Sequence, residues 1–343
     1  MPLQVRPPLA PMEALSVDAI PEGEEWQYEP KWDGFRCLAF RDEDKIELQS
    51  KSQQPLARYF PELVRAVSEV KARRFVLDGE IAVPEGTSFS FDALLQRIHP
   101  AASRVERLSV ETPAIYIAFD LLADDDGRSL LELPLRERRR HLERFAGEFF
   151  IKGRRIRLSP ATPSLAQAKD WLAQASTTLD GIIAKRRDLG YRSGERDGIQ
   201  KIKSFRSADC VVGGFRYGKG KKTVGSLLLG LYDTNGLLHH VGFTSSISAS
   251  DRPALTKKLE KLAAPPGFTG SAPGGPSRWN QGKENVWHPL KPELVVEVCY
   301  DHVTGNRFRH GTKLLRWRPD KLPEQCKMDQ PAQKKTDLLR LLK

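Results

Sequence analysis

The residues most suited to covalent chemistry lie in one short stretch near the N-terminus. Glu29-Pro-Lys31-Trp-Asp33-Gly34-Phe-Arg36 places a lysine among charged side chains, just ahead of a glycine-containing turn and a strand. A lysine with the ordinary pKa of about 10.4 is neutral in only about one part in 2,500 at pH 7. Nearby positive charge disfavours the ammonium form and makes such an amine nucleophilic. The stretch therefore predicts a lysine nucleophile, although these eight residues alone also fit a surface hairpin with a salt bridge.

Four later segments supply the partners that such a lysine needs. They are Asp78-Gly79-Glu80, Phe119-Asp120, Asp180-Gly181-Ile-Ile183-Ala-Lys185 and Lys201-Ile-Lys203. Side chains two apart in a strand share a face, so Lys185 would lie beside Ile183, and Lys201 beside Lys203. Taken singly, each segment also fits a plain structural role, with Phe119 in a core and the lysines in solvent.

The elements that position these residues alternate along the first 204 residues. Residues 1 to about 30 are rich in proline and acidic residues, which predicts an extended arm. Short apolar runs then predict strands, and amphipathic spacing predicts helices. The predicted strands are 35–40, 75–83, 114–122 and 181–185, and the predicted helices are 59–70, 91–98, 135–145 and 164–175. This mixture predicts an α+β domain with an antiparallel or mixed sheet.

The second half of the chain has a different pattern. Strands are predicted at 208–215, 226–232, 237–243, 294–300 and 314–318, with a helix at 252–263. Five strands with one helix between the third and fourth match a small OB-type barrel, a fold that often binds nucleic acid. The predicted domains are 1–204, 205–322 and a tail at 323–343. The tail fits either a short helix docked on the body or a frayed terminus.

Composition narrows the class of protein. The 343 residues include 55 Lys and Arg against 44 Asp and Glu, a net charge of +11, which predicts a polyanionic partner. Solubility alone is the plainer explanation of that charge. Apolar runs such as 114–122 are too short to span a bilayer, and the first 20 residues contain no apolar block. Four scattered cysteines argue against a disulfide framework or a zinc site, so we expect a cytoplasmic protein.

In order and spacing, these motifs resemble the covalent nucleotidyltransferase superfamily, and within it the ATP-dependent DNA ligases. The nucleophile motif Lys31-x-Asp33-Gly34-x-Arg36 precedes the four segments above in the family's order. The resemblance continues at Arg309-His-Gly and at Arg316-Trp-Arg318-Pro-Asp320-Lys321, and covers nearly the whole chain. It is greatest to small bacterial stand-alone ligases and to the ligase module of bacterial end-joining enzymes. The expected fold is a nucleotidyltransferase (adenylation) domain followed by an OB-fold barrel.

The resemblance implies a three-step reaction. Lys31 attacks the α-phosphorus of ATP, releases pyrophosphate and becomes lysine–AMP. The AMP moves to the 5′-phosphate at a nick in double-stranded DNA, and the 3′-hydroxyl then seals the strand and releases AMP. Phosphoryl transfer of this kind depends on charge cancellation more than on covalent help.

The resemblance also assigns roles to individual residues. Lys31, Arg36, Lys185 and Lys203 would be catalytic, with Lys201 supporting the phosphate. Phe119 and Ile183 would sandwich adenine, Glu29 would accept from its amino group, and Arg36 and Glu80 would bind ribose. Asp180 would be the main protein ligand of Mg²⁺ or Mn²⁺, with Asp33 and Glu80 nearby, and Arg316 and Arg318 would orient pyrophosphate. The family's fourth motif usually opens with glutamate, whereas this chain has Asp180.

One basic loop and one basic helix lie outside these motifs. Arg216, Lys219, Lys221 and Lys222 would hold the phosphates that flank a nick, although a solvated hairpin tip is the plainer alternative. The arginine-rich stretch 135–144 predicts a helix with a solvated charged face. The expected partners are nicked DNA and a DNA-end-binding protein. We expect a monomer associated with the bacterial nucleoid.

Three alternatives stay open beside a DNA ligase. An RNA ligase or an mRNA-capping guanylyltransferase belongs to the same superfamily, and the motif at 309–321 weighs against both. A NAD-dependent ligase is disfavoured because no zinc-like cysteine set is present. A non-catalytic DNA-end clamp is disfavoured because Lys31, Glu80, Lys185 and Lys203 are all retained.

Overall fold

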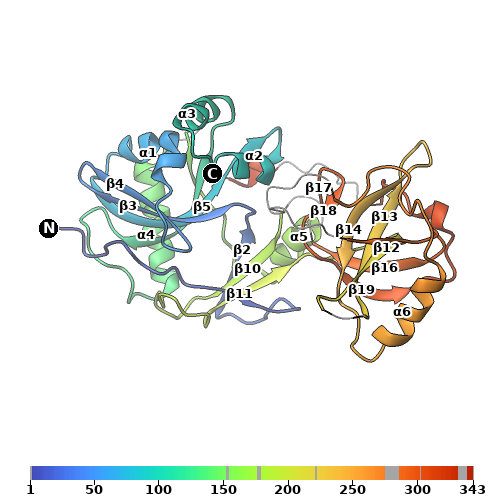
Figure 1. The fold of residues 1–343 in the computed structure, drawn as a ribbon. Coiled ribbons are helices and arrows are strands. Elements are labelled where there is room, and N and C mark those ends of the chain that lie inside the picture. The colour runs from blue at the N-terminus through green and yellow to red at the C-terminus, as the bar shows by residue number, and fades with distance from the viewer. Residues whose placement is uncertain are drawn as a thin grey trace. The chain divides into compact units, whose positions relative to one another are not determined.

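The computed structural model describes residues 2–151, 154–175, 179–220, 222–274, 286–301, 303–330 and 338–342. The chain forms two compact units (Figure 1). The first unit comprises Met1–Ser204 together with Lys334–Lys343, and the second unit comprises Phe205–Gln333.

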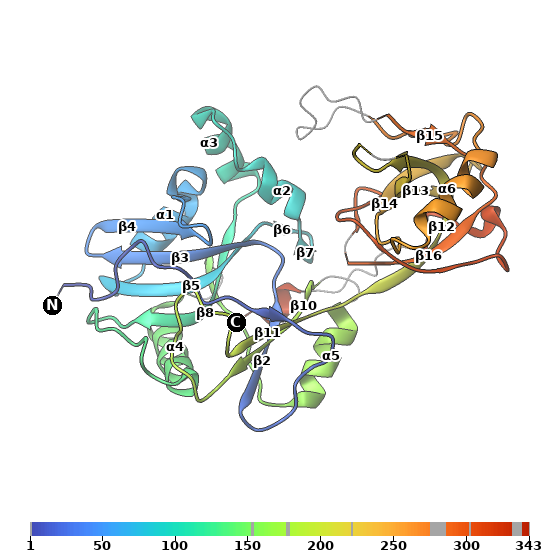
Figure 2. The ribbon, with the colours of Figure 1, turned by 60° about the horizontal axis from the view of Figure 1, so that its bottom comes forward.

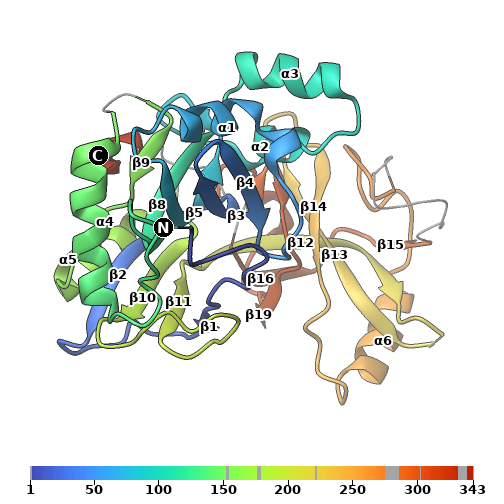
Figure 3. The same cartoon turned by 90° about the vertical axis from the view of Figure 1, so that its left-hand side faces the viewer.

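Two sheets form the framework of the first unit and lie in adjacent layers (Figures 2 and 3). The five-stranded sheet has the order β4 (Lys45–Ser50), β3 (Phe35–Asp42), β5 (Arg74–Ala82), β8 (Ile115–Ala123), β9 (Ile156–Leu158). The four-stranded sheet has the order β1 (Leu15–Ser16), β11 (Ile199–Lys203), β10 (Gly181–Arg186), β2 (Trp26–Lys31). A small separate pair joins β6 (Pro84–Glu85) to β7 (Ser88–Phe89). Only β8–β9 and β1–β11 are parallel in these two sheets, so the predicted mixed sheet is confirmed.

Helices cover the outer faces of both sheets. The helices of this unit are α1 (Pro61–Ser68), α2 (Phe91–Gln96), α3 (Ala102–Glu111), α4 (Leu135–Phe149) and α5 (Leu165–Ala175), with short 3₁₀ turns at η1 (Ala57–Tyr59) and η3 (Leu339–Leu341). α1 packs on β3 and β4, α4 on β8 and β9, and α5 on β2 and β10. Within the described parts of the chain, no helix combines the length and the apolar character that a membrane span requires.

The alternation of side chains along a strand explains why the sequence of β3 is an almost continuous apolar run. Cys37 and Ala39 point into the core beneath α1 and α4, whereas Leu38 and Phe40 point into a second core between the two sheets. Successive side chains of a strand face opposite sides, so a strand buried on both sides needs apolar residues at every position. The two sheets are therefore held together by packing, and residues that face each other across them keep fixed positions.

The second unit is a small barrel. Its strands are β12 (Arg206–Tyr217), β13 (Val224–Tyr232), β14 (Leu238–Thr244), β16 (Val295–Tyr300) and β19 (Lys313–Trp317), in the sheet order β14-β13-β12-β16-β19. A bridge between Thr244 and Thr312 joins the two edge strands. Helix α6 (Arg252–Lys261) falls between the third and fourth of these strands, so the predicted OB-type arrangement is confirmed. The remaining elements are β15 (His288–Pro289), β17 (Val303–Thr304), β18 (Arg307–Phe308) and η2 (Pro323–Gln325).

Three sequence predictions in the first unit need correction. The arm at residues 1 to about 30 is not simply extended, because Leu3 and Val5 are buried in the inter-sheet core and 26–31 form strand β2. Pro30 made β2 hard to recognise from the sequence. A proline is tolerated in this strand because β2 is the edge strand of its sheet. Helix α3 was missed because it buries few apolar residues.

Helix α4 also differs from its prediction as a helix with a solvated charged face. Arg138 is buried and donates through Nε and Nη2 to the carboxylate of Asp120, at 3.0 Å each. Arg139 is buried too and donates to the carbonyl of Ser159. A buried bidentate ion pair fixes α4 against β8, and a local sequence pattern does not reveal such a distant partner.

The end of the chain docks on the first unit (Figure 1). Leu338 is 1% exposed and packs in a cluster with Trp32 and Leu179, the neighbours in sequence of Lys31 and Asp180. Its amide also donates to the carbonyl of Thr87 at 2.8 Å. Of the two readings of the tail, docking on the body is therefore confirmed for residues 338–342.

Replacing Leu338 by alanine tests this docking. Deleting a buried leucine side chain typically destabilises a protein by about 2–4 kcal/mol, so we expect L338A to lower the free energy of unfolding of the first unit by that amount. Urea unfolding measures the change. Leu322, which is 64% exposed, provides the matched control, and L322A is expected to change stability by less than about 0.5 kcal/mol. Equal values for the two variants would contradict the docking.

Candidate active site

The pleat of the four-stranded sheet gathers the predicted site residues on one face. In the antiparallel register, Glu29 on β2 lies opposite Ile183 on β10, and Ile183 lies opposite Lys201 on β11. Alternate residues such as Tyr28 and Ile182 point the other way and pack with α5. The face toward the five-stranded sheet thus carries Glu29, Lys31, Ile183, Lys185, Lys201 and Lys203.

Gly181 sets how closely Lys31 and Lys203 approach each other. It pairs with Lys31 on one side and with Lys203 on the other. Its φ is +138°, and a Cβ at this position would lie 2.0 Å from the carbonyl oxygen of Ile202. Only glycine fits that conformation and that space. The two lysines therefore flank a residue without a side chain.

A cavity of about 450 Å³ opens between the two sheets, within the usual size range of ligand sites. Eight of the predicted site residues line it: Glu29, Lys31, Arg36, Glu80, Phe119, Ile183, Lys185 and Lys201. It combines an aromatic ring, an aliphatic side chain and several cations, as a purine nucleotide requires. Lys203 and Asp180 are not lining residues, but they connect to the cavity through Lys31.

The amine of Lys31 is held by a carboxylate. Its Nζ donates to Oδ2 of Asp180, and the amide of Asp180 donates to the carbonyl of Lys31 at 3.1 Å. Nζ of Lys203 lies 3.9 Å from the other oxygen of Asp180. Asp180 thus joins two of the predicted catalytic lysines. The ion pair between Lys31 and Asp180 is real, but the surface-hairpin reading is wrong because β2 and β3 belong to different sheets.

Glu29 and Lys185 form a second pair at the deep side of the cavity. Nζ of Lys185 lies 2.7 Å from Oε2 of Glu29 and 4.4 Å from the centre of the Phe119 ring. The amide of Gln27 donates to Oε1 of Glu29 at 2.9 Å. Glu29 and Lys185 are both at most 5% exposed. An adenine amino group would therefore approach a carboxylate whose position is already fixed. The sequence analysis did not single out Gln27, because one glutamine in a segment that was not recognised as a strand forms no motif.

Arg36 is fixed in the same way by Asp78. Its Nε and Nη2 each donate to the Asp78 carboxylate at 2.6 Å, and the guanidinium lies 4.6 Å from the centre of the Phe119 ring. The hydroxyl of Tyr191 donates to Asp78 at 2.7 Å. Burial lowers the pKa of Arg36, but the Asp78 carboxylate outweighs burial and raises the pKa above its ordinary value. Asp78 belonged to a recognised motif but was assigned no role, whereas Tyr191 belonged to no recognised motif.

Glu80 is the carboxyl of this site that titrates near neutrality. Burial raises its pKa to about 7, and the charges of Lys31 and Arg36 only partly oppose that effect. Asp33 and Asp78 act in the same direction as burial. Near pH 7 the side chain of Glu80 is therefore divided between its neutral and ionised forms.

The predicted metal ligands do not form a metal cage by themselves. Within the described ranges, no group of three or more His, Cys, Asp or Glu side chains is placed to hold a metal ion. Mg²⁺ usually binds one or two protein carboxylates and completes its shell with phosphate oxygens and water. In this structure the Asp180 carboxylate is bonded to Lys31, and its other oxygen lies 3.9 Å from Lys203. The assignment of Asp180, Glu80 and Asp33 to a metal stays a prediction.

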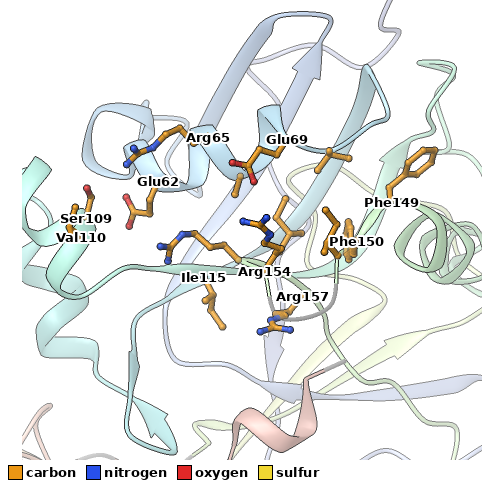
Figure 4. A pocket seen from close by; sticks show the side chains of 15 residues that line it. Glu62, Arg65, Glu69, Ser109, Val110, Ile115, Phe149, Phe150, Arg154 and Arg157 are labelled. Atoms are coloured by element: carbon orange, nitrogen blue, oxygen red, sulfur yellow. The ribbon is translucent and has the colours of Figure 1, made fainter.

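A larger cavity of about 570 Å³ lies elsewhere in the first unit (Figure 4). Side chains of α1, α3 and the segment around Arg154 line it, including Arg65, Glu69 and Val110. Among the described residues, no lysine lines it, and the carboxylate of Glu62 is bound by the buried Arg97. Size alone therefore does not identify the chemical site, and the smaller cavity has the suitable side chains.

The predicted pyrophosphate motif lies on the second unit and is also paired with carboxylates. Arg316 Nε donates to Glu297 at 2.7 Å, and Arg318 Nη1 donates to Asp209 at 2.9 Å. Lys321 donates to the other oxygen of Asp209 at 2.6 Å. Asp209 is buried and thus positions two residues of the motif. Nothing in its sequence neighbourhood indicated this role.

The predicted DNA-contacting residues divide between a strand and a loop. Arg216 is half-buried near the end of β12, so it does not belong to the loop that we predicted. Lys219 and Lys222 are exposed on the following loop, and Lys221 lies outside the described residues. The two described lysines of the loop are thus open to solvent, whereas Arg216 is partly enclosed.

Comparison with known proteins identifies the family. The family model described as ATP dependent DNA ligase domain matches residues 7–203, and the one described as ATP dependent DNA ligase C terminal region matches residues 220–321. The chain belongs to the ATP-dependent DNA ligase family. The two matches cover most of the chain, so the resemblance seen in the motifs is confirmed and the protein is an enzyme of this ligase family.

Named relatives of the ligase family agree in length and sequence. DNA ligase C2 of Mycolicibacterium smegmatis is 45% identical over 95% of each chain, and DNA ligase C of Mycobacterium tuberculosis is 44% identical over 95% of this chain and 94% of its own. The end-joining repair protein LigD of M. tuberculosis is 30% identical over 92% of this chain but only 39% of LigD. A solved Lig E DNA ligase covers 90% of this chain and 99% of its own, with a TM-score of 0.55 at 17% identity, which supports the fold alone.

The raised pKa of Glu80 predicts a pH-dependent gain of stability in E80Q. A carboxyl whose pKa rises from about 4.5 to about 7 on folding favours the folded state only while it is protonated, so wild-type stability falls as pH rises through that range. E80Q cannot ionise, so its advantage should grow above about pH 4.5 and level off near pH 8 at about 1–3 kcal/mol. Urea unfolding at several pH values, without nucleotide or metal, measures the difference. E85Q, at an exposed site, provides the control, and an E80Q advantage independent of pH would contradict the account.

The position of Asp209 predicts a selective defect in the first reaction step. D209N removes a carboxylate charge that pairs with both Arg318 and Lys321, while Asp320 still holds Arg318, so we expect the KM for ATP in adenylation to rise about 10-fold, equivalent to about 1.4 kcal/mol. Sealing of a nick that already carries AMP releases no pyrophosphate and should change less than about twofold. Initial-rate assays of both steps measure the split. The exposed Asp251 gives the matched control D251N, and equal loss of both steps in D209N would exclude this positioning role.

Proposed function

We propose that this chain seals nicks in duplex DNA with ATP, through AMP bound first to Lys31 and then to the 5′-phosphate of the DNA. The observation that carries the proposal is the position of Lys31. Its amine lines a cavity that also presents Phe119, Ile183 and several cations, in a chain of the ATP-dependent DNA ligase family.

Adenine would bind between Phe119 and Ile183, which line the cavity from different sheets. Glu29, held by Lys185 and Gln27, would accept from the amino group of adenine, a contact that GTP cannot make. Arg36 and Glu80 lie opposite each other on β3 and β5 and would bind ribose. The base and the sugar thus place the α-phosphate near Lys31.

In the first step, the Nζ of Lys31 forms a bond to the α-phosphorus and the bond to pyrophosphate breaks. The incoming amine must first lose a proton and its ion pair with Asp180. Lys185, Lys203 and Lys201 would offset the negative charge that develops on the phosphate oxygens. Asp180 orients the amine until the nucleotide is bound. Mg²⁺ or Mn²⁺, held by Asp180 with Glu80 or Asp33 and by the triphosphate, would neutralise the charge of the phosphates.

The second unit would serve the other substrates. Arg316 and Arg318 would orient the leaving pyrophosphate, while Arg216, Lys219, Lys221 and Lys222 would contact DNA phosphates without reading sequence. We accordingly propose residues 1–204 as the adenylation domain and 205–322 as the OB-fold domain. The name of the LigD relative supports a role in DNA repair by end joining. A DNA-end-binding protein partner and association with the nucleoid are further parts of our proposal.

Labelling with ATP tests the proposal. We expect wild-type protein with Mg²⁺ and α-labelled ATP to acquire acid-stable label that nicked DNA removes, and K31A to acquire none, because K31A lacks the amine that we propose bonds to the α-phosphorus. K45A, at an exposed lysine, is the matched control and should label like wild type. Label from GTP would favour a capping guanylyltransferase, and absence of label in wild type would favour a non-catalytic clamp.

A further inference from the structure

The second unit carries a basic cluster whose arginines have no ion-paired carboxylate among the residues that the structure describes. Arg216 lies on β12, His240 on β14 and Arg307 on β18, which packs against β14 (Figure 1). Nη2 of Arg307 lies 3.1 Å from Nδ1 of His240. Hairpin strand β18 therefore brings Arg307 against His240, and the positive charge of Arg216 acts on both of these side chains.

His240 is held neutral in this cluster. The side chain is 5% exposed and packs edge-on against Phe268, with ring centres 5.3 Å apart. Burial, then Arg307 and Arg216, lower the pKa of His240 to about 3. A neutral ring can accept a hydrogen bond, so Nδ1 accepts from the guanidinium of Arg307. The other ring nitrogen, Nε2, is buried without a hydrogen-bond partner.

The two arginines repel each other, and no carboxylate of the described residues is ion-paired with either of them. Burial and Arg307 lower the pKa of Arg216, and its Nε is buried without a hydrogen-bond partner. Among the described residues, no carboxylate forms an ion pair with Arg216 or Arg307. Arg316 and Arg318, by contrast, each have a carboxylate partner on the same unit. An anion bound by both arginines would offset their repulsion and accept hydrogen bonds from their guanidinium groups.

We propose that Arg216 and Arg307 jointly bind one backbone phosphate of DNA, and that His240 is the positioning residue that orients Arg307. This inference rests on the proposed ligase function, because it takes nicked duplex DNA as the source of the phosphate. A guanidinium presents paired N–H donors that match phosphate oxygens, and a neutral histidine can accept from one of them without adding charge. Arg307 thereby joins the proposed DNA-contacting residues, His240 acts only through Arg307, and Arg216 makes its contact from strand β12.

Salt dependence of DNA affinity tests the shared phosphate. Each phosphate contact contributes about 0.9 to the slope of log affinity against log salt. We expect R307A and R216A each to lower that slope by about 0.9, and to lower the affinity of adenylated protein for nicked duplex about 10-fold near physiological salt. Because both arginines contact one phosphate, R216A/R307A should lower the slope no further than either single variant. K257A, at an exposed lysine of α6, controls for loss of charge and should leave the slope unchanged.

The role of His240 has its own pair of variants. H240L removes the acceptor of Arg307 without changing charge, so we expect a weaker slope and affinity, whereas H240Q retains an acceptor and should restore both. Thermal unfolding shows whether H240L is folded. If it is not, the exposed Arg307 still tests the phosphate site through R307A.

Three results would overturn the proposal. A slope change of about 1.8 in R216A/R307A would mean two separate phosphates, and equal effects of R307A and K257A would mean general electrostatic attraction. A higher KM for ATP in R307A with unchanged DNA affinity would assign the site to the nucleotide. Failure of wild-type protein to label with ATP would instead contradict the ligase function, so the two failures are distinguishable.

Discussion

The ion pair between Lys31 and Asp180 is the interaction on which the arrangement of this site depends. A flexible lysine amine reaches a phosphorus atom only if its position is restricted beforehand, and a carboxylate on the neighbouring strand supplies that restriction. The strand pairing through Gly181 brings the two residues together, and the cluster of Trp32, Leu179 and Leu338 packs beside them. Backbone pairing and core packing therefore both restrict the position of Lys31, the proposed nucleophile.

The same principle recurs across the site. Lys185 is paired with Glu29 and Arg36 with Asp78, so the cations are oriented before any nucleotide arrives. Such preorganisation lowers the free energy of reorganisation during the reaction. Arg216 and Arg307 depart from the pattern, because a neutral histidine takes the place of a carboxylate beside Arg307. The carboxylate-paired cations of the cavity would act on the nucleotide, whereas Arg216 and Arg307, which have no ion-paired carboxylate among the described residues, would act on DNA.

Sequence patterns predicted much of this structure, and their failures have a common cause. The order of the motifs predicted which side chains line the cavity, and apolar runs predicted strands such as β3 and β8 because both are buried. The pairing of Asp78 with Tyr191 joins residues 113 positions apart, and that of Asp209 with Arg318 joins residues 109 apart. Strand β2 was hidden by Pro30. Long-range partners and edge strands leave no local periodicity, so only the folded chain reveals them.

Peptide mapping by mass spectrometry tests the central claim most directly. After incubation of the full chain with ATP and Mg²⁺, followed by denaturation and proteolysis, the account predicts one AMP on the peptide that contains Lys31, with fragment ions that place it on that side chain. AMP on another lysine of the cavity, such as Lys185 or Lys201, or an unmodified Lys31 peptide in protein that nevertheless seals nicks, would contradict it.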